Sequence, residues 1–168
     1  LARSLEAGAI DLAGLDSGRE ASVAVREAVL TLRRAKSMIL DEADPHSRSA
    51  GSFFLNPVLT DAQLDEVRRR WVGRGQPAGD VPAFPTKGGH KVPAAWLVER
   101  SGFTKGYRRG GVGISQSHAL ALVNYDGASA DLLALSEEVM AAVSSAFGVR
   151  LEREPVYVPP HGGGDGGG

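Results

Sequence analysis

The sequence predicts an α+β domain in which helices pack on a small mixed sheet. Four segments carry apolar residues at the three-to-four-residue spacing of one helix face, whereas the apolar runs between them are short and bounded by turn-forming residues. With 168 residues, 42% of them hydrophobic, the chain is long enough to bury a core of its own. Helices and short strands that share one core are typical of the α+β class.

The first predicted helix covers residues 17–36. Its apolar stripe comprises Val25, Ala28, Val29 and Leu32. Ser17 and Glu20 have the spacing of a capping box, which would fix the start of this helix. Residues 52–55 then form an apolar run that is too short for a helix and is stopped by an Asn-Pro pair. We therefore expect a buried strand or extended segment at 52–55.

A second helix is predicted over residues 60–70, where Thr60 and Gln63 again have capping-box spacing. Residues 73–89 are rich in Pro and Gly and poor in apolar residues, which predicts a long loop, and long loops in compact domains are usually functional or disordered. Pro93 is well placed as the first residue of a third helix that reaches Arg100, because proline is favoured at the first helical position.

The last third of the chain predicts a strand at 119–123 and the longest helix after it, with Ser129 as the capping residue and Gly148 just past the end. Residues 149–158 resemble an edge strand broken by Pro155. The final segment, His161 to Gly168, is a glycine-rich tail of low complexity for which we expect disorder.

Composition excludes several classes of protein. The 19 Lys and Arg nearly balance the 20 Asp and Glu, which argues against nucleic acid or an anionic membrane as the main partner. The absence of Cys excludes disulfides, thiolate metal sites and a Cys nucleophile. No apolar run approaches the ~20 residues of a membrane span and no signal peptide opens the chain, so we expect a cytoplasmic protein.

Residue patterns alone leave the chemistry open. Ser52 follows Gly51 and precedes two Phe, which is consistent with a hydroxyl at a dry ligand boundary or with a tight turn that feeds a core strand. Arg33 and Lys36, three residues apart, suit a phosphate or carboxylate, or simply a solvated surface. A Ser hydrolase built on Ser52 and His118 lacks the G-x-S-x-G elbow.

Two other sites are weakly supported by the residues. The cluster Gly110 to Gly113 lacks the remaining signature of a phosphate-binding loop, so an ordinary turn is favoured. The four His show no zinc-ligand spacing, and we expect no metal site. Glu154, an isolated carboxylate ahead of Pro155, indicates nothing by itself.

Several phrases together resemble a known family. They are R-x-x-K at 33–36, SAGSFFLNP at 49–57, FPTKGGHKVPAAWLVE at 84–99, GFTKGYRRGGVGISQSHALALVN at 102–124 and FGVRLEREPVYV at 147–158. Their order resembles the C-terminal part of the UDP-N-acetylenolpyruvoylglucosamine reductase (MurB) family, flavoenzymes of bacterial peptidoglycan synthesis. The resemblance covers residues 17–158, and the SAGSFF-x-NP phrase is highly specific.

The resemblance implies a substrate-binding domain of a flavoenzyme that uses FAD and NADPH. Such an enzyme transfers hydride to the enolpyruvyl ether of UDP-N-acetylglucosamine enolpyruvate and yields UDP-N-acetylmuramate. Ser52 matches the family's proton-donating serine, and Glu154 matches its catalytic carboxylate. A positioned hydroxyl in a site that excludes water can protonate a basic enolate, so the match is chemically coherent.

The same resemblance implies a set of substrate-binding residues, which are Arg33, Lys36, Asn56, Phe84, Lys91 and His118. Lys91 matches a contact to the diphosphate, for which a lysine point charge is suitable. Phe84 stands where relatives with this long loop usually have Tyr, which keeps the ring and loses its hydroxyl. His118 matches a polar position that is Gln in some relatives.

The resemblance also implies a domain organisation. Residues 1–36 would be the end of a preceding FAD-binding domain with a connecting helix, 37–148 the substrate-binding domain, 149–160 a C-terminal strand carrying Glu154, and 161–168 the disordered tail. The chain starts at Leu1 rather than Met and lacks the family's flavin-phosphate loops, so we expect a fragment that is inactive alone, and a monomer. The alternative is a non-catalytic module that binds a UDP-sugar in the same cleft.

Overall fold

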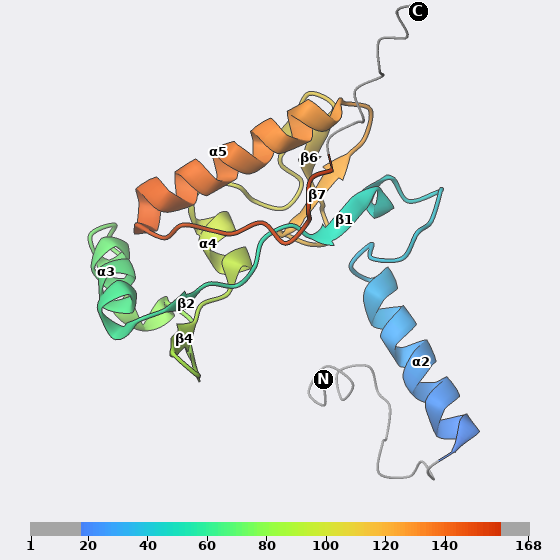
Figure 1. The fold of residues 1–168 in the computed structure, drawn as a ribbon, viewed down its shortest axis with the longest axis horizontal. Coiled ribbons are helices and arrows are strands. Elements are labelled where there is room, and N and C mark those ends of the chain that lie inside the picture. Colours follow the sequence, from blue (N-terminus) through green and yellow to red (C-terminus); the bar gives the residue numbers. More distant parts are fainter. Residues whose placement is uncertain (1–17, 159–168) are drawn as a thin grey trace, which may run out of the picture.

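The computed structural model describes residues 18–158, and its helices and strands are shown in Figure 1. The helices are α2 (Arg19–Arg34), α3 (Asp61–Val72), α4 (Ala94–Arg100) and α5 (Ser129–Phe147). The strands are β1 (Ser49–Ser52), β2 (Val58–Leu59), β3 (Phe84–Thr86), β4 (Gly89–Lys91), β5 (Arg108–Arg109), β6 (Val112–Ile114) and β7 (Ala121–Asn124). This composition confirms the α+β class. The predictions for Ser17 and for residues 161–168 lie outside the described residues.

The strands form two small antiparallel sheets, so the predicted single mixed sheet is wrong. One sheet has the order β1-β7-β6-β5 and the other has the order β2-β4-β3. Every pairing of named strands in the described range is antiparallel. For the hairpins β3–β4 and β5–β6 the physical reason is the short connection. Turns of a few residues join β3 to β4 and β5 to β6, whereas a parallel pair needs a crossover of a dozen residues or more.

Helix α5 supplies much of the core by packing on β6 and β7 and on the two shorter helices α3 and α4. Its inner face buries Leu135, Val139 and Val143 completely. Helix α2 stands apart from this body in Figure 1, at the start of the segment that leads into β1. The main core therefore lies between α5 and the four-stranded sheet and continues to α3 and α4.

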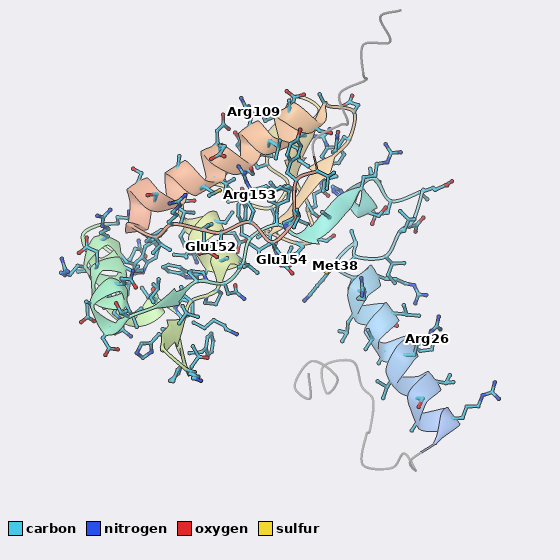
Figure 2. The ribbon with its side chains drawn as sticks, in the orientation of Figure 1. Arg26, Met38, Arg109, Glu152, Arg153 and Glu154 are labelled. Atoms are coloured by element: carbon cyan, nitrogen blue, oxygen red, sulfur yellow. The ribbon has the colours of Figure 1, made fainter. Side chains whose placement is uncertain are left out.

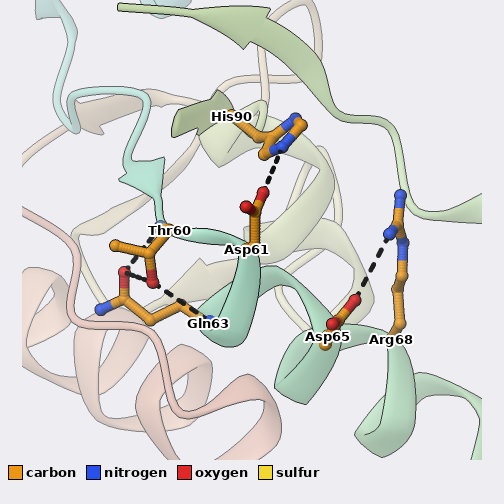
Figure 3. Close-up of polar contacts among 6 residues, drawn as sticks. All are labelled: Thr60, Asp61, Gln63, Asp65, Arg68 and His90. Carbon is orange, nitrogen blue, oxygen red and sulfur yellow. Dashed lines mark hydrogen bonds and ion pairs between the residues drawn. The ribbon is translucent and has the colours of Figure 1, made fainter. Parts of the chain in front are cut away.

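The helix ends largely follow the predictions. Thr60 Oγ1 accepts a hydrogen bond from the Gln63 N–H at 3.3 Å, and Gln63 Oε1 accepts from the Thr60 N–H at 2.9 Å (Figure 3). This reciprocal pair is the predicted capping box. Gly148 ends α5 with a φ of 70°, as a C-terminal glycine does. The first helix is shorter than predicted, at Arg19–Arg34.

The start of α5 differs from the prediction that Ser129 is its cap. Ser129 is the first helical residue and Ala128 precedes it. The capping contact comes instead from Asp131, whose Oδ2 accepts the Ala128 N–H at 2.9 Å. An acidic side chain three residues into the helix satisfies a backbone donor that the helix itself leaves free, and it is favoured by the helix dipole.

The predicted loop over 73–89 is only partly a loop, because its second half forms the hairpin of β3 and β4. Thr86 pairs with Gly89, which leaves Lys87 and Gly88 as a two-residue turn. Gly88, the second central residue of this turn, has a φ of 90°, the positive value that a type II turn requires at that position. The Lys-Gly-Gly sequence between two short segments indicated this turn, but the high Pro content of the region favoured its interpretation as a loop.

The turn that the sequence favours at the glycine cluster is confirmed at Gly110, since it joins β5 to β6.

The segment around Ser52 is extended but divided between two partners. Strand β1 pairs with β7 and ends at Ser52, earlier than the predicted strand at 52–55. Phe53 N–H then donates to Leu120 O at 2.8 Å, and Leu55 N–H donates to Glu152 O at 2.9 Å. Phe53 and Phe54 are 4% and 1% exposed, so the predicted burial is confirmed for these two residues, whereas Leu55 is 44% exposed.

The C-terminal segment is not the edge strand that residues 149–158 predict. Within these residues the only ladder contact is one antiparallel bridge between Phe54 and Arg153. Pro155 follows closely and has no N–H to continue the pairing.

Across residues 18–158, no helix combines the length and the apolar character that crossing a membrane requires.

Candidate functional site

A cleft of about 780 Å³ opens where the end of α2, strand β1 and the C-terminal segment meet. Its apolar wall consists of Met38, Ile39 and Leu40, and its polar side chains include Arg33, Ser52 and Glu154. Figure 2 shows Met38 beyond the end of α2 and Glu154 on the C-terminal segment. Three of the residues predicted for the site, Arg33, Ser52 and Glu154, therefore line one cavity although they are far apart in the sequence.

Backbone pairing places Glu154 beside Phe53, the residue that follows Ser52. The Glu154 N–H donates to Phe53 O at 3.0 Å, and this bond lies immediately after the bridge between Phe54 and Arg153. Gly51, directly before Ser52, has a φ of 81°, a conformation that L side chains rarely adopt. The small-residue phrase in the sequence is thus a backbone bend that turns Ser52 into the cleft.

Ser52 contacts a second predicted residue, His118. Ser52 Oγ lies 3.2 Å from His118 Nε2, and the Leu120 N–H donates to His118 Nδ1 at 3.4 Å. Burial lowers the pKa of His118 below its usual 6.5, and the positive charges of Lys36 and Lys105 lower it further. The imidazole at this site is therefore held in its neutral form near pH 7.

This geometry does not form the catalytic arrangement of a Ser hydrolase, which was the alternative considered for Ser52 and His118. In that constellation the histidine accepts the serine proton at one nitrogen, while the other nitrogen donates to a carboxylate. Here the second nitrogen faces a backbone N–H, which can only donate. The ring nitrogen facing Ser52 therefore carries the proton and does not act as a base toward Ser52.

The end of α2 brings two basic residues close to the cleft. Arg33 Nε donates to Met38 O at 3.2 Å, which folds the chain back after the helix. Lys36 lies beyond the last residue of α2, so the two do not share a helical surface as their spacing suggested. Its exposed charge still acts on the pKa of His118.

Ser37 contributes to the site without having been predicted from the sequence. Its φ of 54° is unusual for a residue other than glycine, and its side chain is buried. Ser37 Oγ donates to Ser117 Oγ at 3.2 Å, which links the end of α2 to the turn that carries His118. A lone serine between a lysine and a short apolar run gives no sequence signal for such a contact. Only the spatial proximity of the two segments reveals it.

The remaining predicted residues lie at the smaller sheet. Phe84 on β3 and Lys91 on β4 are register partners, and both are exposed, Phe84 by 58%. Asn56 Oδ1 accepts the Ala94 N–H at 2.8 Å, so its carbonyl oxygen holds the start of α4. Asn56 borders a second cavity, of about 560 Å³. The eight predicted residues thus fall into two groups, one around Ser52 and one at the β2-β4-β3 sheet.

A further contact stabilises this second group. His90 Nε2 lies 2.8 Å from Asp61 Oδ1, as Figure 3 shows, and the contact joins β4 to the first turn of α3. His90 precedes Lys91 on the strand, so the pair fixes the position from which Lys91 extends. The sequence drew attention to His90 only as one of four histidines without metal-ligand spacing.

The glycine cluster at 110–113 offers no cradle for the diphosphate of FAD. The glycine cluster at 110–113 is packed against the protein, since the Gly111 carbonyl accepts the N–H groups of Tyr125 and Asp126. A Cβ on Gly111 would overlap the backbone of Gly127, and one on Gly113 would overlap the carbonyl of Tyr107, so these two glycines permit close packing and leave no open nest. Among residues 18–158, no three His, Asp or Glu side chains are grouped to hold a metal ion.

The fold and cleft define an α+β domain with a site suited to proton transfer, in which a hydroxyl, a neutral imidazole and a carboxylate come from distant segments. The chain belongs to the UDP-N-acetylenolpyruvoylglucosamine reductase family, because residues 44–158 match the model of that family's C-terminal domain. This finding confirms the resemblance inferred from the sequence motifs.

Individual relatives agree with this assignment. The chain is 49% identical over 161 residues to the UDP-N-acetylenolpyruvoylglucosamine reductase of Thermobifida fusca, a match that covers 94% of this chain and 43% of the relative. It is 50% identical to the enzyme of that name from Streptomyces coelicolor, covering 86% of this chain and 39% of the relative. The chain therefore spans about two fifths of the length of these relatives, at their C-terminal part.

Proposed function

We propose that this chain provides the substrate side of a flavin-dependent reductase of peptidoglycan precursor synthesis. The reaction is the reduction of UDP-N-acetylglucosamine enolpyruvate to UDP-N-acetylmuramate, with NADPH as the source of electrons. The observation that supports this proposal most strongly is the position of Ser52 and Glu154 at one cleft, on segments that are 102 positions apart in the sequence but are joined through backbone hydrogen bonds.

Reduced FAD, when bound, supplies hydride to the enolpyruvyl group. Addition of hydride to the vinyl carbon leaves negative charge on the neighbouring carbon and its carboxylate, and that carbon must then receive a proton. Ser52 is the donor in this proposal, because its hydroxyl lines the cleft and is held by a neighbouring ring. Glu154 lines the same cleft as Ser52 and helps to position the reacting group. General acid catalysis of this kind contributes typically about 10² to 10⁴-fold.

The nucleotide-sugar would extend away from this centre. Arg33 and Lys36 are the cations nearest the cleft in the set inferred from the resemblance, and they suit the negatively charged parts of the substrate. The exposed Phe84 and Lys91 on the smaller sheet offer a ring and a point charge for the more distant diphosphate and its substituents. In this proposal Asn56 donates through its amide nitrogen, because its carbonyl oxygen already accepts from Ala94.

A hybrid protein tests the proposal. The matching C-terminal part of the Thermobifida fusca relative is replaced by this chain, and the purified hybrid is mixed with NADPH and then with UDP-N-acetylglucosamine enolpyruvate. We expect NADPH to bleach the flavin and the enolpyruvyl substrate to restore its absorbance, with UDP-N-acetylmuramate detected by mass spectrometry. The unmodified relative is the control for the assay.

A different result would contradict the reductase proposal. If the hybrid binds FAD, is bleached by NADPH and binds the enolpyruvyl substrate, but forms no product, the alternative of a non-catalytic UDP-sugar-binding module is supported. Calorimetry with UDP-N-acetylglucosamine, which lacks the enolpyruvyl group, shows whether the cleft recognises only the nucleotide-sugar.

A further inference from the structure

The turn between β6 and β7 fixes the backbone that carries His118. Ser117 N–H donates to Ser115 Oγ at 3.1 Å, and Ser115 itself is completely buried. The Ala121 N–H donates to His118 O at 3.1 Å, which closes the turn around the histidine. These bonds fix the backbone on both sides of His118, and the ring's own contacts with Ser52 and Leu120 then orient it.

The contacts of the ring determine where its proton lies. The Leu120 N–H is a donor, so His118 Nδ1 must accept and carries no hydrogen in the neutral ring. The hydrogen therefore resides on Nε2, which faces Ser52 Oγ at 3.2 Å. The burial and the positive charges that lower the pKa of His118 also favour this neutral form.

A hydroxyl that accepts such a bond keeps its own hydrogen for another partner. A serine hydroxyl has a single hydrogen and two lone pairs, and the Nε2–H bond occupies one lone pair. We propose that His118 is a positioning residue, which holds Ser52 Oγ by donating Nε2–H and so leaves the Ser52 hydrogen free to be donated into the cleft. The identity of the proton acceptor, the reduced enolpyruvyl carbon, rests on the proposed function.

The same hydrogen bond becomes stronger as the proton leaves. In the transfer, the Ser52 O–H bond breaks, its electron pair remains on Oγ, and a C–H bond forms on the substrate carbon. The Nε2–H donor then faces a developing alkoxide, and a hydrogen bond to a charged acceptor is roughly twice as strong as a neutral one. Water afterwards returns a proton to Oγ. His118 keeps its hydrogen throughout, because losing it would leave an imidazolate.

The first test measures the ring itself in the 168-residue chain. Histidine is labelled with nitrogen-15, and the tautomer of His118 is obtained from long-range proton–nitrogen spectra above its pKa, with His118→Gln used for assignment. We expect the Nε2–H tautomer. The Nδ1–H tautomer would overturn the proposal, because Nε2 would then accept the Ser52 proton.

The second test separates positioning from substrate binding in the hybrid. His118→Ala should slow reoxidation of the flavin by the enolpyruvyl substrate by roughly 10²-fold, as for removal of one donor to a developing oxyanion. Flavin reduction by NADPH and the KM for the substrate should change little. His118→Gln should restore most of the rate, because its amide N–H can donate from nearly the same place. His46→Gln, whose ring contacts Tyr125, is the control.

The outcomes distinguish this inference from the proposed function. If the unmodified hybrid reduces the substrate and His118→Ala matches it, the positioning role is overturned while the proposed function stands. A raised KM with unchanged kcat in His118→Ala would also overturn it, in favour of a substrate contact. If the unmodified hybrid forms no product, the proposed function fails. The tautomer measured in the 168-residue chain then still shows whether His118 donates a hydrogen bond to Ser52.

Discussion

Ser52 and Glu154 line the cleft from separate segments, and His118 contacts Ser52 from a third. Their proximity depends on individual hydrogen bonds, such as the bond from Glu154 N–H to Phe53 O. The contact between Ser52 and His118 also converts an ambiguous pair into a directional one, because the backbone N–H of Leu120 decides which ring nitrogen is protonated. The backbone N–H of Leu120 thus decides whether the His118 nitrogen that faces Ser52 is a base, as in a Ser hydrolase, or a hydrogen-bond donor.

The charge near His118 gives a prediction at this scale. Lys36→Gln should raise the pKa of His118, because it removes one of the positive charges that disfavour the imidazolium. The pKa should stay below 6.5, since burial is the larger cause. Arg34→Gln, a neighbouring exposed cation that is not among the causes, should leave it unchanged. The measurement is an NMR titration of the His118 ring in the three proteins.

The same lowered pKa makes stability depend on pH in a defined direction. Below 6.5 the unfolded chain binds a proton at His118 before the folded chain does, so acid favours unfolding. This contribution of His118 is fully present above pH 6.5 and is lost as the pH falls through the folded-state pKa. Urea unfolding at pH 7.5 and pH 5.5 should show a smaller loss of stability in His118→Gln than in the unmodified chain. An equal or larger loss in His118→Gln would contradict the pKa direction.

Sequence motifs identified most of these residues only through the resemblance to a family. Composition alone left Ser52 balanced between a ligand contact and a structural turn, and it left Glu154 without any interpretation. The tautomer of His118 and the part played by Ser37 were not predictable, because both depend on a neighbour that is distant in the sequence.

At the scale of elements, local chemistry was a good guide to helices and a poor one to short strands. The capping box at Thr60 and the glycine after α5 act within a few residues, so their signals are present in the sequence. Strands of two to four residues are too short to show the alternating pattern by which a strand is recognised in a sequence. For this reason the hairpin of β5 and β6 was missed, and the hairpin of β3 and β4 was interpreted as a loop.

The small sheet depends on one glycine in particular. An alanine at Gly89 would place its Cβ against the carbonyl of Leu59, at a φ of 145° that L residues rarely adopt. Gly89→Ala should therefore lower the free energy of unfolding by on the order of 2 kcal/mol or more. Gly79→Ala, in the preceding loop, meets no atom within 4 Å and has no unusual φ, so it should change stability by less than about 1 kcal/mol. Urea denaturation of both variants checks this. Equal effects would contradict the assigned strand pairing.

At the scale of the whole molecule, an aromatic cluster unites the helices. Phe147 at the end of α5 lies with its ring centroid 5.4 Å from that of Trp96 on α4 and 6.2 Å from that of Trp71 on α3. The guanidinium of Arg74 lies 5.1 Å from the centre of the Phe147 ring. These contacts connect the smaller sheet's side of the protein with the helix that covers the larger sheet, so both residue groups of the proposed site depend on one core.

This cluster predicts the energetic weight of Phe147. Phe147 is 1% exposed, and Phe147→Ala should cost about 3 to 5 kcal/mol through lost burial and the cavity left behind. Phe84→Ala, at a ring that is 58% exposed, should stay within about 0.5 kcal/mol of the unmodified chain. Urea unfolding followed by tryptophan fluorescence measures both. A similar cost for the two variants would show that the cluster is not the centre of the core.

The most direct measurement is single-turnover reoxidation of the reduced flavin by UDP-N-acetylglucosamine enolpyruvate in the hybrid carrying Ser52→Ala. The serine exposed on α5 provides a matched control as Ser144→Ala. We predict that Ser52→Ala slows product formation by about 10² to 10⁴-fold, while flavin reduction by NADPH and the Ser144→Ala rates remain unchanged. Unchanged product formation in Ser52→Ala would contradict the proposal that the Ser52 hydroxyl provides the proton.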